Sequence, residues 1–154
     1  MNKILLFSLI LLLGIQTTSA VIGKLSSVKF ASIKFNEVNV HTGPAGDTPV
    51  DWVFIKKGEP VEVVAEYDQW RKIRDIKGEG GWIRATALSL KKRSVIITSE
   101  NVVPLLAKPK NYDKVVAKVE PQYRCELRKC EDDSCQVSCN SYKGWINKKY
   151  LWGI

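Results

Sequence analysis

The sequence has few of the residues that catalysis requires. His41 is the one histidine among 154 residues. Nucleophilic catalysis needs a base held beside the nucleophile, and the sequence places no serine or cysteine as a partner for His41. The acids Asp68, Asp75 and Glu79 fall in turns and form no paired arrangement. We therefore predict that the protein is not an enzyme and uses no cofactor.

Helical periodicity is also missing from any segment of useful length. Polar and apolar residues instead alternate in short runs, such as 61–67 and 70–74, which is the pattern of half-buried strands. Turn-forming residues separate these runs, most densely at 42–49. Several short strands within about 55 residues are typical of a small barrel or sandwich, so we expect an all-β fold.

Cysteine is absent except in one short stretch, which holds Cys125, Cys130, Cys135 and Cys139. Structural zinc sites usually pair ligands two residues apart, and redox pairs use the same spacing. The gaps here are four, four and three residues. An even, clustered set in an exported chain indicates two disulfides, and we predict no metal site.

The beginning of the chain has the layout of a secretory signal peptide. Lys3 precedes an apolar run over 4–15, and small residues follow at 18–20. The alternative is a membrane anchor, but twelve apolar residues are too few to cross roughly 30 Å of hydrocarbon. We expect cleavage after Ala20 and a periplasmic or secreted mature chain, 21–154, without a transmembrane span.

Positive charge is concentrated in the second half of the chain. Residues 21–90 carry ten Lys and Arg against nine Asp and Glu, whereas residues 91–154 carry thirteen against seven. In an exported protein this excess favours anionic envelope polymers, membrane surfaces or acidic proteins as partners, rather than nucleic acid. The alternative is that the lysines serve solubility alone.

A repeat divides the chain into two units. Gly81-Trp82-Ile83 with Leu88 recurs as Gly144-Trp145-Ile146 with Leu151, 63 residues later. A repeat of that period in so short a chain indicates two copies of one small unit. We place the first unit at 35–88, a linker at 89–98 and the second unit at 99–154, with 21–34 as a lead-in that adds an edge strand.

Several motifs together resemble the bacterial SH3-like (SH3b) domain family, and most closely its exported two-copy alphaproteobacterial type. They are 38–44 (VNVHTGP), 60–64 (PVEVV), 70–75 (WRKIRD) and 81–83 (GWI). The likeness covers 35–154 and implies two tandem SH3-like β-barrels. The family often has arginine where His41 stands, and the second unit replaces the loop motif by 105–109 (LLAKP). The two units are therefore not expected to bind alike.

The second unit is expected to use disulfides where the first uses tryptophan. Cys135 is aligned with Trp70, so the bridges would replace lost core volume. Pairing across the hairpin joins Cys130 to Cys135. Cys125 would then face Asn140, so a bridge to Cys139 needs a one-residue bulge.

The resemblance implies a non-catalytic binding module of the cell envelope, which recognises cell-wall peptidoglycan. Ligand contacts are predicted for His41, Trp52, Tyr67 and Asp68. Core positions are predicted for Trp70, Trp82 and Trp145.

Two further functions remain open. One is a periplasmic protein–protein adaptor that offers a sheet edge for strand addition, for which Val95-Ile96-Ile97 is the candidate edge unless it is buried. The other is a regulatory partner that acts in trans on a cell-wall hydrolase.

Overall fold

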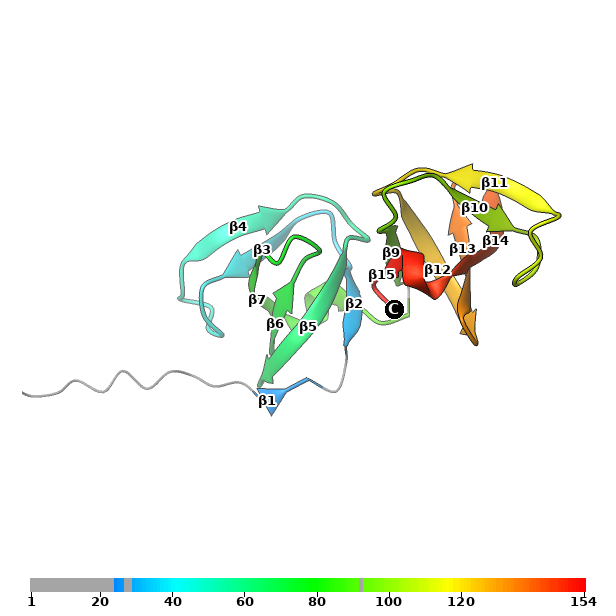
Figure 1. Ribbon diagram of the computed structural model, residues 1–154. Coiled ribbons are helices and arrows are strands. Elements are labelled where there is room, and N and C mark those ends of the chain that lie inside the picture. Colours follow the sequence, from blue (N-terminus) through cyan, green and yellow to red (C-terminus); the bar gives the residue numbers. More distant parts are fainter. Residues whose placement is uncertain (1–23, 27–28, 92) are drawn as a thin grey trace, which may run out of the picture.

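A computed structural model describes residues 24–26, 29–91 and 93–154. The predicted signal peptide at 1–20 lies outside these described residues. The described chain is all-β, with two short 3-10 turns and two separate sheets that lie side by side (Figure 1). The predicted fold class is thus confirmed.

Unit one is the sheet formed by the first eight strands. Its hydrogen-bonded order is β4-β3-β7-β6-β5-β2-β8, and β1 pairs with β5. The elements are β1 (Lys24–Leu25), β2 (Phe30–Ile33), β3 (Val38–His41), β4 (Val50–Phe54), β5 (Pro60–Tyr67), β6 (Trp70–Arg74), β7 (Gly80–Arg84), η1 (Ala85–Ala87) and β8 (Leu88–Ser89).

Unit two repeats this order as β11-β10-β14-β13-β12-β9-β15. Its elements are β9 (Ser94–Ile97), β10 (Val103–Leu106), β11 (Val115–Val119), β12 (Arg124–Glu131), β13 (Ser134–Cys139), β14 (Tyr142–Asn147), η2 (Lys148–Tyr150) and β15 (Leu151–Trp152). Strand by strand, β9 to β15 correspond to β2 to β8, so the repeat extends beyond the Gly-Trp motif.

The equivalent strands β2 and β9 come from segments that the sequence analysis placed outside the two repeats. All four residues of β2 are buried, and Ala31 and Ile33 are each only 1% exposed. The predicted linker contains β9, which pairs with β12 and β15. Val95, Ile96 and Ile97 are buried between these strands, so they are not the free sheet edge that was considered above.

The glycine of each Gly-Trp motif lets two strands approach closely. A Cβ on Gly81 would lie 2.6 Å from Val40 Cγ1 and 2.8 Å from the carbonyl oxygen of His41. A Cβ on Gly144 would lie 2.7 Å from both Leu105 Cγ and the Leu106 oxygen. Real Cβ atoms do not come so near other atoms. Glycine is therefore needed where β3 lies against β7 and where β10 lies against β14.

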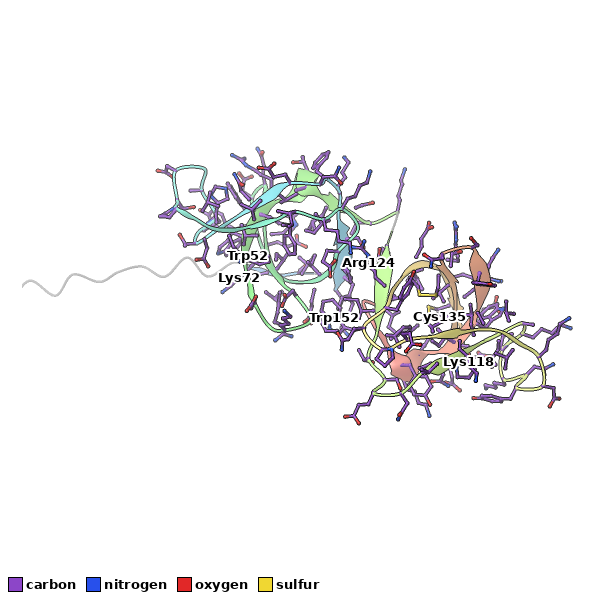
Figure 2. All side chains as sticks on the ribbon, turned by 90° about the horizontal axis from the view of Figure 1, so that it is seen from above. Trp52, Lys72, Lys118, Arg124, Cys135 and Trp152 are labelled. Atoms are coloured by element: carbon purple, nitrogen blue, oxygen red, sulfur yellow. A yellow bond between two sulfur atoms is a disulfide. The ribbon has the colours of Figure 1, made fainter. Side chains whose placement is uncertain are left out.

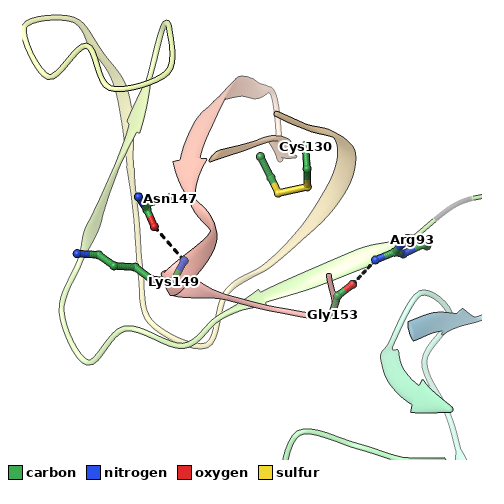
Figure 3. Close-up of a disulfide and its surroundings, with 6 residues drawn as sticks. Arg93, Cys130, Asn147, Lys149 and Gly153 are labelled. Atoms are coloured by element: carbon green, nitrogen blue, oxygen red, sulfur yellow. Dashed lines mark hydrogen bonds between the residues drawn. A yellow bond between two sulfur atoms is a disulfide. The ribbon is translucent and has the colours of Figure 1, made fainter. Parts of the chain in front are cut away.

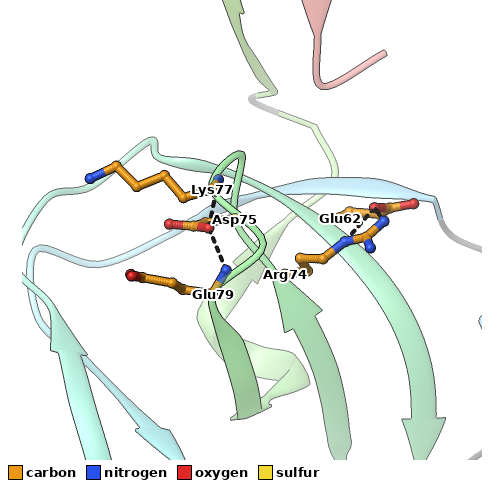
Figure 4. A network of polar contacts seen from close by, with 5 residues as sticks. All are labelled: Glu62, Arg74, Asp75, Lys77 and Glu79. Carbon is orange, nitrogen blue, oxygen red and sulfur yellow. Dashed lines mark hydrogen bonds and ion pairs between the residues drawn. The ribbon is translucent and has the colours of Figure 1, made fainter.

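Ordinary polar contacts hold the turns of unit one. Asp75 accepts hydrogen bonds from the backbone N–H groups of Lys77 and Glu79, both at 2.9 Å, and so shapes the β6–β7 turn. Arg74 pairs with Glu62 across β5 and β6 at 2.5 Å (Figure 4). These residues stabilise a hairpin and its turn.

Strand register corrects the predicted alignment of Trp70 with Cys135. Trp70 pairs with Arg84 on β7, and Ser134 pairs with Asn147 on β14. Since Arg84 and Asn147 both follow Gly-Trp-Ile, Ser134 is the equivalent of Trp70. Cys135 corresponds to Arg71, because each is opposite the isoleucine of the motif. The disulfide therefore does not stand in for that tryptophan.

Two disulfides join β12 to β13. Cys130 and Cys135 are opposite one another, with Cα atoms 4.0 Å apart, and Cys125 is bonded to Cys139, with Cα atoms 4.6 Å apart. A register shift between Leu127 and Lys129 supplies the one-residue irregularity that this second bridge needs. Cys125, Cys135 and Cys139 belong to the buried core of unit two.

The two units touch through hydrogen bonds and one contact between aromatic rings. Arg124 donates to Glu59 at 2.8 Å, and the backbone N–H of Ser94 donates to the buried hydroxyl of Ser32 at 2.8 Å. The rings of Phe30 and Trp152 meet edge to face at 5.3 Å. Arg124 and Trp152 lie where the units meet (Figure 2).

Candidate functional site

A row of side chains crosses the middle strands of unit one. Tyr67 on β5 pairs with Trp70 on β6, and Trp70 pairs with Arg84 on β7. The Arg84 guanidinium carbon lies 4.4 Å from the Trp70 ring centroid, which is a cation–π contact. Arg84 Nη1 also donates to Gln69 Oε1 at 3.4 Å. Tyr67 is 46% exposed, and Arg84 is exposed. The row thus offers solvent an aromatic ring and a cation.

His41 joins this row to the 42–49 loop. Its ring meets Trp70 edge to face at 5.0 Å, and its Nδ1–H donates to the carbonyl oxygen of Thr48 at 3.0 Å. The Thr48 hydroxyl in turn donates to the carbonyls of Gly43 and Ala45. The loop is therefore held by side-chain hydrogen bonds next to the aromatic row. We call His41, Tyr67, Trp70 and Arg84 the Trp70 cluster.

The other two predicted ligand residues lie in different surroundings. Asp68 follows Tyr67 in the β5–β6 turn, has a φ of 46°, and accepts a hydrogen bond from Arg71 on its carbonyl oxygen at 3.0 Å. Trp52 pairs with Val40, packs against the unit-one core, and lies 4.4 Å from the Phe54 ring. The structure therefore groups His41 and Tyr67 around Trp70, with Asp68 adjoining them, and leaves Trp52 with the core.

The three tryptophans predicted for the core are buried, but they lie apart from the main apolar clusters. Trp70, Trp82 and Trp145 are 4%, 6% and 7% exposed. None belongs to the main apolar cluster of its unit, which contains Ile83 or Ile146. Because neighbouring side chains alternate across a strand, Trp82 and Trp145 face away from those isoleucines. Cations cover two of the rings, because Arg84 lies over Trp70 at 4.4 Å and Lys129 lies over Trp145 at 5.2 Å.

Unit two lacks the Trp70 cluster. By register, Leu106 replaces His41, because both pair with the tryptophan of the motif. Ser134 replaces Trp70 and Asn147 replaces Arg84. The sequence interpretation missed Arg84, although its place two residues after Trp82 was a usable signal. Only the register shows that this arginine is opposite Trp70.

The cluster is suited to noncovalent recognition. An arginine presents several N–H donors in a plane and binds carboxylates well, and an exposed aromatic ring stacks on apolar faces. Among the described residues, no three His, Cys, Asp or Glu side chains are grouped to hold a metal ion. Within the same part of the chain, no helix has the length and apolarity needed to cross a membrane.

The matches from comparison with known proteins include one protein family and two solved structures. The family model of the bacterial SH3 domain matches residues 34–89 and 99–153. NlpC2 from Trichomonas vaginalis is 13% identical, with a TM-score of 0.38, over 80% of this chain and 47% of that one. NlpC1 from the same organism is 14% identical, with a TM-score of 0.38, over 86% and 49%.

The chain spans about half the length of these two solved proteins. Comparison with curated proteins gives no significant match. The two family matches together cover most of the chain and coincide with the two sheets, apart from strands β1, β2 and β9. The protein therefore belongs to the bacterial SH3 domain family, with two tandem copies of the domain.

Proposed function

We propose that the protein is a non-catalytic, exported module that binds cell-wall peptidoglycan through the Trp70 cluster of unit one. Bacterial SH3 domains in general bind cell-wall material. The two disulfides fit an extracytoplasmic location. The observation that carries the proposal is Arg84 lying over Trp70 at 4.4 Å, in the one unit that has both residues.

The chemistry of peptidoglycan matches this cluster. Its peptides carry carboxylates, which Arg84 would bind through its exposed N–H groups. Its sugars have apolar faces, on which Tyr67 would stack. His41 contributes by holding the loop at Thr48, and Trp70 by supporting the arginine. Unit two would bind weakly or not at all through the equivalent surface, because Ser134 and Asn147 offer neither group.

A pulldown on insoluble peptidoglycan, at low and high salt, tests this proposal. The variants are Tyr67→Ala and Arg84→Ala. The matched controls are Tyr142→Ala, an exposed tyrosine of unit two, and Arg74→Ala, an exposed arginine of unit one outside the cluster. We expect each cluster variant to lose about tenfold in affinity, equivalent to about 1.4 kcal/mol, and each control to bind like the unaltered protein.

Two outcomes would reject the proposal. The first is that high salt abolishes binding of the unaltered protein and that Arg84→Ala and Arg74→Ala weaken binding equally, which would indicate diffuse charge attraction. Absence of binding at either salt concentration would exclude peptidoglycan as the ligand. Trp52→Ala is not a suitable variant, because the Trp52 ring packs against the core and its removal would also destabilise unit one.

One observation favours a second candidate function, a protein–protein adaptor. β4 and β11 are edge strands of their sheets, and each exposes apolar side chains: Val50 and Val53 on β4, and Val115 and Val116 on β11. Such edges are where an extended peptide adds a strand. Crosslinking of a photoreactive residue placed at Val53 or Val116, followed by identification of the captured protein, would test this function.

A further inference from the structure

A cleft of about 650 Å³ is lined mainly by positively charged residues. Six of its lining residues are basic: Lys29, Lys91, Arg93, Arg128, Lys129 and Lys148. They come from the segment before β2, the connection between the units, β12 and η2. Among the described residues, no acidic side chain lines this cleft. Unit one, the connection and unit two must therefore come together to build it.

Most of this positive charge is left without a partner within the described chain. Arg128 has an ion pair with Glu126 at 3.2 Å, and Lys129 has one with Glu131 at 2.5 Å. No ion pair in the described part of the protein involves Lys29, Lys91, Arg93 or Lys148. Like charges held close together repel one another, so the cleft gains stability when an anion enters it.

Arg93 is the most constrained of the six cations. Its Nη2 donates to the carbonyl oxygen of Gly153 at 2.7 Å (Figure 3). Its Nε is buried, with no hydrogen-bond acceptor among the described residues. Burial lowers the pKa of Arg93 from its ordinary value, because desolvation disfavours the charged guanidinium. A buried donor without an acceptor is unfavourable, and an anion in the cleft would stabilise the charged guanidinium electrostatically.

The positive surface continues into a second cleft of about 540 Å³. Lys91 lines both clefts, and the second adds Lys34 and Lys57, with one acid, Glu126. Glu126 is itself paired with Arg128. Cations therefore follow one another from the first cleft, past Lys91, into the second. A small anion would occupy only a part of this surface, whereas a chain of anionic groups would use its length.

We propose that the junction between the units binds a linear anionic polymer whose phosphate groups recur at short intervals. A phosphate offers several oxygens to surrounding ammonium and guanidinium groups, which suits the dense cationic lining. Nucleic acid is disfavoured, because single strands are held by stacking on aromatic rings and none of the residues lining either cleft is aromatic. This site is separate from the Trp70 cluster and does not depend on the function proposed for it.

Calorimetric titration of the purified protein at fixed ionic strength tests the proposal. The probes are orthophosphate, long-chain inorganic polyphosphate, a single-stranded oligodeoxynucleotide with the same number of phosphates, and vesicles of phosphatidylglycerol. The cleft variant is Lys91→Ala with Lys148→Ala. The control is Lys77→Ala with Lys143→Ala, which removes the same charge from exposed positions outside both clefts.

We expect polyphosphate to bind at least about tenfold more tightly than the other three probes. The cleft variant should lose about tenfold in affinity, and the control about twofold or less. Equal losses in the two variants would overturn the proposal in favour of diffuse charge attraction. It would also be overturned by tighter binding of the oligodeoxynucleotide or the vesicles, or by no binding of polyphosphate. Circular dichroism of each variant, matched to the unaltered protein, shows that the fold is retained.

Discussion

Glu59 of unit one accepts a hydrogen bond from Arg124 of unit two at 2.8 Å, across the junction between the two repeats. Both side chains are partly buried, at 29% and 25% exposed. A Cβ added to Gly58, beside Glu59, would lie 3.6 Å from the Ser94 hydroxyl oxygen and 3.8 Å from Arg124 Cζ. The turn between β4 and β5 therefore meets β9 and β12 of unit two, and Gly58 and Ser94 at this contact line the second basic cleft.

The ion pair between Glu59 and Arg124 should couple the two units measurably. We expect a double-mutant cycle with Glu59→Gln and Arg124→Gln to give a coupling of about 0.5–1 kcal/mol in urea unfolding, reduced in 0.5 M salt. The control cycle uses Lys110 and Asp133, whose side chains are 63% and 72% exposed, and should give almost no coupling. A zero value for the first pair at low salt would show that the contact does not stabilise the junction.

Alanine in the Gly-Trp motif should destabilise either unit by a similar amount. Gly81→Ala and Gly144→Ala each place a Cβ against backbone oxygen and core side chain, and overpacking of this kind costs about 1–3 kcal/mol. Gly78→Ala is the control, because its added Cβ meets nothing within 4 Å. Only its φ of 88° is unfavourable for alanine, which should lower the free energy of unfolding by about 1 kcal/mol. Thermal unfolding measures all three, and equal losses would contradict the close approach of the strands.

The two disulfides should differ in their effect on unit two. Cys125→Ala with Cys139→Ala opens a bridge of sequence separation 14, whereas Cys130→Ala with Cys135→Ala opens one of separation 5. The entropy of loop closure in the unfolded chain predicts that the free energy of unfolding falls by about 3 kcal/mol for the first pair and by about 2 kcal/mol for the second. The first pair also removes two buried sulfur atoms from the core, whereas the second removes one, because Cys135 is buried and Cys130 is exposed. Urea unfolding compares them, and a larger loss for the Cys130 pair would contradict this order.

Removal of β2 should unfold unit one. A chain that begins at residue 34, where the family match begins, lacks Ala31 and Ile33 from the core and the pairing of β2 with β5 and β8. Each large apolar side chain lost from a core costs about 2–5 kcal/mol. A chain that begins at residue 29 is the control and should keep both units. Hydrogen exchange distinguishes the units, and full protection of β5 in the shorter chain would contradict the role given to β2.

Local patterns predicted much of the architecture. Alternation of polar and apolar residues located most strands, because half-buried strands require it. The spacing of the cysteines indicated the two bridges and the bulge between them, because cross-strand partners must be opposite each other. The repeated Gly-Trp-Ile motif identified the two units. All of these signals act between residues close in sequence, or come from a direct comparison of one copy with the other.

The tertiary structure decided what depends on distant strands. The sequence by itself determined two β units, their disulfides and the excess of positive charge in the second half. Only the strand register shows that Trp70 pairs with Arg84 and is equivalent to Ser134 in unit two. The number of residues between equivalent positions of the two copies differs from strand to strand, so the sequence repeat does not give this equivalence. Likewise, Lys29, Arg93 and Lys148 are scattered along the chain and meet in one cleft. Only the packing of the two units against each other brings these cations together.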